Sequence, residues 1–127
     1  MTRINVVPPA ELVNKHLMAE YRELPRIFTD VRKRVAKGQQ PADIQQPDRY
    51  KLGAGHCLFF VTRCGWLLER YQQLCGELLE RGYNLNLELF NDICDAAELL
   101  PSQWCGAYQP DADAMQINRQ RIKERLQ

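Results

Sequence analysis

The sequence has few cysteines, and they do not form a ligand pattern. Five occur, at positions 57, 64, 75, 94 and 105, and no two have the C-x-x-C spacing. An odd count without paired spacing excludes a zinc ribbon or an iron–sulfur cluster of the usual kind and does not suit a disulfide framework. Reduced thiols of a cytoplasmic protein fit better. We therefore expect buried, inert thiols, no bound metal and no cofactor.

Long hydrophobic runs are also missing. No apolar stretch approaches the roughly 18 residues that a membrane-spanning helix needs. The first nine residues, Met1–Pro9, lack the apolar core of a secretory signal. We expect no membrane partner and a cytoplasmic location. The 127 residues are enough for one modest core, so residues 1–127 are expected to form a single domain and a monomer.

Net charge is nearly absent, at +1, but the charges are segregated along the chain. Residues 1–56 carry ten Lys and Arg against six Asp and Glu, and residues 115–127 carry four against one. Residues 57–114 carry three against nine. If the two ends meet in the fold, they make a basic face suited to a polyanion. The alternative is ordinary solvated charge on helix surfaces.

Hydrophobic spacing predicts a mainly α fold. Apolar residues recur at steps of three and four over residues 13–35, as on one face of a helix: Val13, Leu17, Tyr21, Leu24, Phe28, Val31 and Val35. Pro25 interrupts this stripe and predicts a kink, because it cannot donate a hydrogen bond to Tyr21.

Three further segments have helical spacing. Residues 64–81 form a second helix with Gly82 after its end. Residues 86–100 suggest a short helix carrying Leu89, Ile93 and Leu100. Residues 112–126 form a last helix with Met115, Ile122 and Leu126 on one side. The run Cys57–Val61 fits either a strand or the start of a buried helix. The predicted architecture is a compact three-helix domain with long irregular loops.

The polar side of the first helix carries a row of cations. Lys15, Arg22, Arg26 and Lys33 cluster opposite the apolar stripe, and such a row repels itself unless an anion is bound. On one shoulder of the row lie His16 and Glu23, seven residues apart and so roughly aligned. A carboxylate among guanidiniums can equally be a plain salt-bridge partner.

The second residue is a candidate nucleophile. Thr2 is small, so we expect removal of Met1 in the cell to expose its α-amine. An α-amine has a pKa near 7.7–8.0, against about 10.4 for lysine, so about a tenth is unprotonated at neutral pH. Such an amine can attack a carbonyl-like or anomeric carbon.

Several blocks of the sequence resemble one family in register. These are Thr-Arg-Ile-Asn at 2–5, His-Leu-Met-Ala-Glu-Tyr-Arg-Glu-Leu-Pro-Arg at 16–26, Val-Arg-Lys at 31–33, Leu-Gly-Ala-Gly-His at 52–56, Phe-Phe at 59–60 and Arg-Gly at 81–82. They are similar to the pyrimidine-dimer DNA glycosylases of the phage endonuclease V type. An eleven-residue block at this distance from the start is far more specific than a short motif.

The resemblance implies a metal-free, three-helix glycosylase with AP-lyase activity. The Thr2 amine would attack C1′ of a cyclobutane pyrimidine dimer, an imine would form, and β-elimination would cut the strand, with Glu23 as the catalytic carboxylate. Arg3, His16, Arg22 and Arg26 match substrate-binding positions. The implied partner is double-stranded DNA containing dimers or abasic sites, kinked and with a base extruded.

The match has departures. Position 15 is Lys where the phage enzyme has Gln, so Lys15 suits a phosphate better than a base edge. Arg121 and Arg125 correspond to basic DNA contacts by pattern alone, and Lys33 belongs to the binding row on charge alone. The aromatic, basic tail that follows the last helix in the phage enzyme is missing here, so we expect weaker affinity or dimer specificity.

Two other functions stay open at this point. One is a DNA-binding module without catalysis, and the other is a related glycosylase acting on oxidised bases. Three further residues are assigned structural roles: a turn for His56, and core or loop packing for Trp66 and Trp104.

Overall fold

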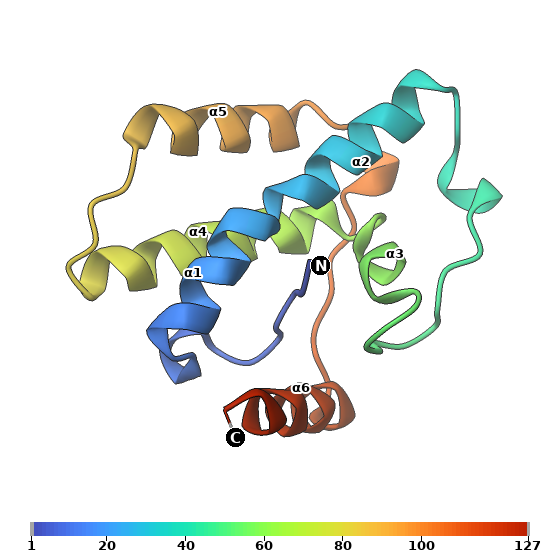
Figure 1. Ribbon diagram of the computed structural model, residues 1–127. Helices are drawn as coiled ribbons and strands as arrows, with labels where there is room; N and C mark the ends of the chain where they lie inside the picture. Colours follow the sequence, from blue (N-terminus) through green and yellow to red (C-terminus); the bar gives the residue numbers. More distant parts are fainter. Residues whose placement is uncertain (1, 127) are drawn as a thin grey trace.

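The computed structural model describes residues 2–126, and it is mainly helical (Figure 1). The helices are α1 (Asn14–Glu23), α2 (Pro25–Ala36), α3 (His56–Phe60), α4 (Cys64–Glu80), α5 (Leu87–Glu98) and α6 (Ala112–Arg125), with short 3-10 turns η1 (Pro9–Glu11), η2 (Pro41–Asp43) and η3 (Ser102–Trp104). Within this range the extended pairing is one isolated bridge, between Arg63 and Cys105. The predicted mainly α fold is confirmed.

The predicted kink at Pro25 separates α1 from α2. Leu24, between the two helices, has helical angles (φ −54°, ψ −42°), so the chain continues in the same direction through the break. The two helices therefore form one bent rod that crosses α4 in Figure 1. Most of the predicted stripe is buried against the core, whereas Val13 precedes the helix and is 40% exposed, so its assignment to the core was wrong.

Helix α4 is the centre of the core. Its buried side includes Leu67, Tyr71, Leu74 and Leu78, the stripe that the sequence predicted. The helix ends at Gly82, whose φ of +90° allows the amides of Gly82 and Tyr83 to bond back to the carbonyls of the last turn. Helix α1 packs on this helix, whereas α2 packs on α5, so the functional residues of α1 have a rigid support.

The remaining patterns are confirmed in part. The run Cys57–Val61, which fitted either a strand or a buried helix, lies in the helix α3 up to Phe60. Of the apolar residues predicted over 86–100, Leu100 is buried and Ile93 packs against the core, while Leu89 is 45% exposed. In the last helix Met115 and Ile122 pack against the core, whereas Leu126 is 56% exposed.

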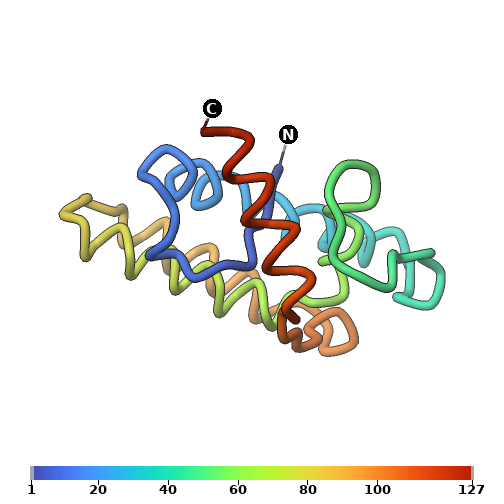
Figure 2. The backbone as a smooth tube through the Cα atoms, turned by 90° about the horizontal axis from the view of Figure 1, so that it is seen from below, coloured from blue at the N-terminus to red at the C-terminus, as the bar shows by residue number. Residues whose placement is uncertain are grey.

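The two ends of the chain meet. Helix α6 lies across the N-terminal segment, as Figure 2 shows from below. The amides of Val6 and Val7 donate to Oδ1 of Asn118 on α6, at 2.7 and 3.1 Å. The basic segments at residues 1–56 and 115–127 are therefore neighbours in space, which is the condition for a joint basic face.

The remaining structural assignments concern the cysteines, the tryptophans and the length of the helices. All five cysteines are free thiols, with Cys57 and Cys105 half-buried. Trp104 is fully buried, and Trp66 stacks on Phe60, so both tryptophans pack as predicted. No helix within residues 2–126 is both long enough and apolar enough to cross a membrane.

Candidate active site

A buried polar network fixes the N-terminal segment. Glu20 on α1 accepts two hydrogen bonds from Arg70 on α4, at 2.8 and 2.9 Å, and one from the Asn5 amide at 2.8 Å. Asn118 on α6 donates to Asn5 at 2.8 Å. Arg70 also donates to the carbonyl of Val7. The network thus joins the segment to three helices at once.

This network is buried almost completely. The side chains of Glu20 and Arg70 are only 1% and 2% exposed. Buried charges are tolerated when they are paired and hydrogen-bonded, as both are here. The sequence did not indicate that these four residues form a network. Glu20 is one of several carboxylates on a charged helix, and Asn118 is one of several polar residues on α6, so neither stands out. Glu20, Arg70 and Asn118 each lie at a position where helical spacing continues a core-facing side, which is the only sign of their burial.

A second set of contacts holds Ile4. Its amide donates to Nε2 of His56 at 2.8 Å, and its carbonyl accepts from the Tyr50 hydroxyl at 3.0 Å. The side chain of Ile4 is itself fully buried. His56 is the first residue of α3, directly after the turn, rather than part of the turn as predicted, and it supports the start of the chain, which was not predicted.

A surface hollow of about 350 Å³ opens beside this segment. Five of its lining residues come from α1, two from the N-terminal segment and one from α6. The lining is Arg3, Asn5, Lys15, His16, Ala19, Glu20, Glu23 and Arg125. The hollow thus brings together five of the site residues that the sequence predicted, although they span most of the chain: Arg3, Lys15, His16, Glu23 and Arg125.

The hollow is electropositive. Partial burial lowers the pKa of the Arg3 guanidinium from its ordinary value, and the charges of Arg125 and Arg121 lower it further. Arginine nevertheless stays protonated in proteins. Partial burial likewise lowers the pKa of His16, and the charges of Arg3, Lys15 and Arg125 add to the shift. His16 is therefore neutral at pH 7, and its buried Nδ1 has no hydrogen-bond partner within residues 2–126.

Thr2 and Glu23 both lie near Cys57. The Cys57 thiol is 3.7 Å from the Thr2 carbonyl oxygen. Burial raises the pKa of this thiol, and the negative charges of Asp30 and Glu23 are among the further causes. Within residues 2–126 Glu23 has no ion pair, so the salt-bridge alternative for this carboxylate finds no partner in the described chain.

The other cations of the predicted row lie outside the hollow. Arg22, Arg26 and Lys33 are exposed on the outer side of α1 and α2, as their spacing predicted, and do not line the hollow. Arg121 lies close enough to Arg3 to affect its pKa and forms a long ion pair, 3.7 Å, with Glu124. Met1 lies outside the described residues.

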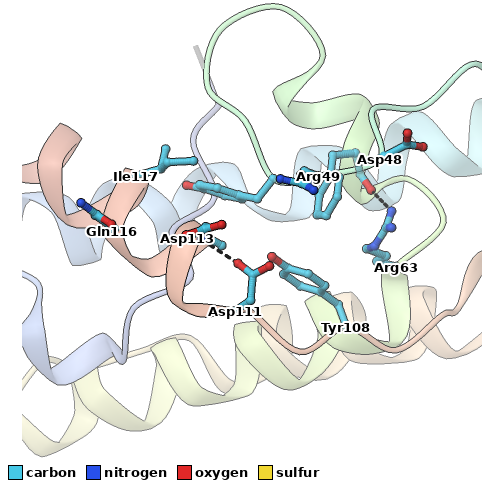
Figure 3. Close-up of a pocket in the computed structure, with 11 residues that line it drawn as sticks. Asp48, Arg49, Arg63, Tyr108, Asp111, Asp113, Gln116 and Ile117 are labelled. Atoms are coloured by element: carbon cyan, nitrogen blue, oxygen red, sulfur yellow. Dashed lines mark hydrogen bonds between the residues drawn. The ribbon is translucent and has the colours of Figure 1, made fainter.

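A second cavity, of about 310 Å³, lies between α3 and the first turns of α6 (Figure 3). Its walls include the rings of Tyr50, Phe59 and Tyr108, and the Arg63 guanidinium sits 3.9 Å from the centre of the Phe59 ring. Three carboxylates, from Asp48, Asp111 and Asp113, face two arginines there. None of the sequence-predicted site residues lines it, and its charge suits a polyanion less well than the hollow beside Arg3.

The described residues contain no group of three or more His, Cys, Asp or Glu side chains arranged to hold a metal ion. The hollow itself offers a carboxylate, an imidazole and several fixed cations, and the cations can hold phosphates. Thr2 precedes Arg3 in the chain but does not line the hollow.

A comparison with known families finds a match over most of the chain. A family model described as pyrimidine dimer DNA glycosylase matches residues 1–91. That range covers the N-terminal segment, α1, α2, α3 and α4, and it contains every predicted site residue except Arg121 and Arg125. The matched range is well over half of the 127 residues. The chain belongs to the pyrimidine dimer DNA glycosylase family.

Proposed function

We propose that this protein excises cyclobutane pyrimidine dimers from duplex DNA and then cleaves the strand as an AP lyase, with the Thr2 α-amine as nucleophile. The observation that carries the proposal is the hollow that Arg3, His16, Glu23 and Arg125 line together, with Arg3 directly after Thr2 in the chain. The proposal assumes that Met1 is removed. With Met1 retained, the amine would lie one residue too far along the chain.

The reaction begins with the unprotonated amine. Its nitrogen attacks C1′ of the 5′ nucleotide of the dimer, and the glycosidic bond breaks with its electron pair passing to the departing base. The amine loses its proton and the sugar ring opens to give an imine between Thr2 and C1′. Removal of a C2′ proton then expels the 3′ phosphate by β-elimination, and water releases the enzyme from the imine. Neighbouring cations favour the neutral amine, because they disfavour a further positive charge.

Glu23 is the proposed catalytic carboxylate. Positive charge develops at C1′ as the base leaves, and a nearby anion stabilises that charge strongly in a partly dry site. The same carboxylate can move protons between the sugar and the amine. The absence of an ion pair within residues 2–126 supports this role, because the charge is not already neutralised.

The proposed DNA contacts are the cations around the hollow. Arg3, Lys15, Arg121 and Arg125 would hold phosphates near the lesion, with His16 as a neutral neighbour. The exposed cations Arg22, Arg26 and Lys33 would extend the contact along α1 and α2. We propose that one copy of the chain, folded as a single domain over residues 1–127, acts in the cytoplasm.

The test compares Glu23→Gln with the wild-type protein in single-turnover excision and in binding to the same dimer duplex. Gln keeps the size and removes the charge, so excision should fall by orders of magnitude while binding persists. Glu11→Gln is the control, because Glu11 is an exposed carboxylate paired with Arg119 and away from the hollow. Excision by Glu23→Gln at the wild-type rate would contradict the proposal. A second duplex with an oxidised purine distinguishes the related glycosylase activity.

A further inference from the structure

The Gly-Ala-Gly-His sequence at 53–56 lies outside the hollow, so the proposed chemistry gives it no role. Gly53 and Gly55 have φ of +74° and +88°, a conformation that residues with a side chain rarely adopt. A Cβ on Gly55 would also lie 3.0 Å from the Pro47 side chain. The two glycines make a tight turn that ends at the first residue of α3, His56. The turn therefore brings the imidazole against the N-terminal segment.

The hydrogen bonds of His56 define its protonation state. The amide of Ile4 can only donate, so Nε2 of His56 must accept and carries no proton. The carbonyl of Lys51, 2.7 Å from Nδ1, can only accept, so Nδ1 carries the proton. The ring is therefore neutral. Arg3 is the charged side chain that acts electrostatically on the His56 ring. Tyr50, which contacts the ring edge-on, is its titratable neighbour.

Ile4 is held on both sides of its backbone. Its amide bonds to His56 and its carbonyl bonds to the Tyr50 hydroxyl, while its side chain is fully buried. Two residues span at most about 7 Å, so the amine of Thr2 cannot move further than that from Ile4. Cys57, which follows His56, limits Thr2 further through its contact with the carbonyl oxygen.

We infer that His56 is a positioning residue that fixes Ile4 and thereby aims the Thr2 amine at the sugar. The inference rests on the proposed nucleophilic role of Thr2. This role concerns the attack and not the binding of DNA, because His56 is buried and lies outside the hollow. Loss of the bond to Ile4 should slow imine formation without weakening DNA affinity, since a reacting atom displaced by about 1 Å can cost up to a hundredfold in rate.

Two amide substitutions distinguish positioning from support of the fold. The amide of His56→Gln can reach the place of Nε2 and accept from Ile4. The amide of His56→Asn reaches only the place of Nδ1, so it can bond to Lys51 but not to Ile4. The control is Gln46→Ala, because the half-buried Gln46 bonds to α3, at the Leu58 carbonyl, and to Thr62, with no hydrogen bond to the N-terminal segment among the described residues.

The experiment measures borohydride trapping on a duplex with an abasic site, in single turnover, with proteins whose Met1 is shown by mass to be absent. Binding to the same duplex and the unfolding midpoint are measured in parallel. We expect His56→Asn to trap at least about tenfold more slowly than wild type at unchanged affinity. His56→Gln should recover most of the rate, and Gln46→Ala should trap at the wild-type rate even if it is less stable.

The inference is overturned if His56→Asn traps as fast as wild type, or if His56→Gln is no faster than His56→Asn. Should His56→Asn not fold, Tyr50→Phe tests the same claim, because it removes only the hydroxyl that holds the Ile4 carbonyl. An unchanged trapping rate in Tyr50→Phe then overturns the inference. A wild-type adduct on a residue other than Thr2 instead refutes the proposed function, so the two failures are distinct.

Discussion

Replacing Arg70 with leucine should damage the protein far more than any other loss of a single ion pair. The substitution removes both hydrogen bonds to Glu20 and the bond to the Val7 carbonyl, and it leaves a carboxylate that is only 1% exposed. Breaking a buried pair by removing one partner costs about 3–5 kcal/mol of unfolding free energy. For a chain of this size that corresponds to a fall of about 12–20 °C in Tm.

The chain offers a matched comparison. Arg119 and Glu11 form an ion pair with the same 2.8 Å separation, but their side chains are 53% and 42% exposed. Arg119→Leu should therefore leave Tm nearly unchanged. Thermal unfolding of both variants, followed by circular dichroism, measures the difference. The double variant Glu20→Leu with Arg70→Leu should be more stable than Arg70→Leu alone, because the unpaired charge is removed. Equal falls in Tm for Arg70→Leu and Arg119→Leu would show that burial does not decide how much the ion pair contributes to stability.

Three further predictions follow from the charges of the site. Arg121→Ala and Arg125→Ala should each reduce the slope of log K against log salt by about 0.9, as measured by DNA binding titrations, whereas Arg119→Ala, paired with Glu11, should not. EDTA should leave excision unchanged; a loss restored by one metal would overturn the proposed mechanism. Burial lowers the pKa of His56 and of His16, so the unfolded chain binds more protons and Tm should fall as pH drops below about 6.5. A Tm independent of pH between 7.5 and 5.5 in thermal melts, measured at roughly half-unit steps across the imidazole range, would contradict the neutral histidines.

The helices could be predicted because their spacing is strong. The stripes of α1, α2 and α4 and the break at Pro25 follow from local geometry alone. The pattern of α6 was right in part, because Met115 and Ile122 pack against the core beside the buried Ala114 and Asn118. Leu126, on the same predicted side, is exposed.

The site could be predicted in part for a similar reason. His16 and Glu23 lie on one helix, and their common side follows from a separation of seven residues. That Arg3 and Arg125 join them depends on contacts between segments more than a hundred residues apart, made by Asn5, Asn118 and the backbone. Periodicity holds no information on such contacts, and the resemblance to the family supplied it instead.

The buried network of Glu20 and Arg70 could not be predicted, because each residue type is usually exposed. Their pairing requires α1 and α4 to cross with these two positions opposite each other. Likewise, the role of His56 depends on a turn whose two glycines have positive φ. The sequence indicated the turn, but not which backbone amide the histidine would meet.

The identity of the nucleophile is the central claim, and peptide mapping of a trapped adduct tests it most directly. The processed protein is incubated with a dimer-containing duplex and borohydride, digested, and analysed by mass spectrometry, beside the same protein with Met1 retained. We expect a reduced sugar adduct on the Thr2 amine of the processed protein and none on the form that keeps Met1. An adduct on a lysine such as Lys15, or equal trapping of both forms, would contradict it.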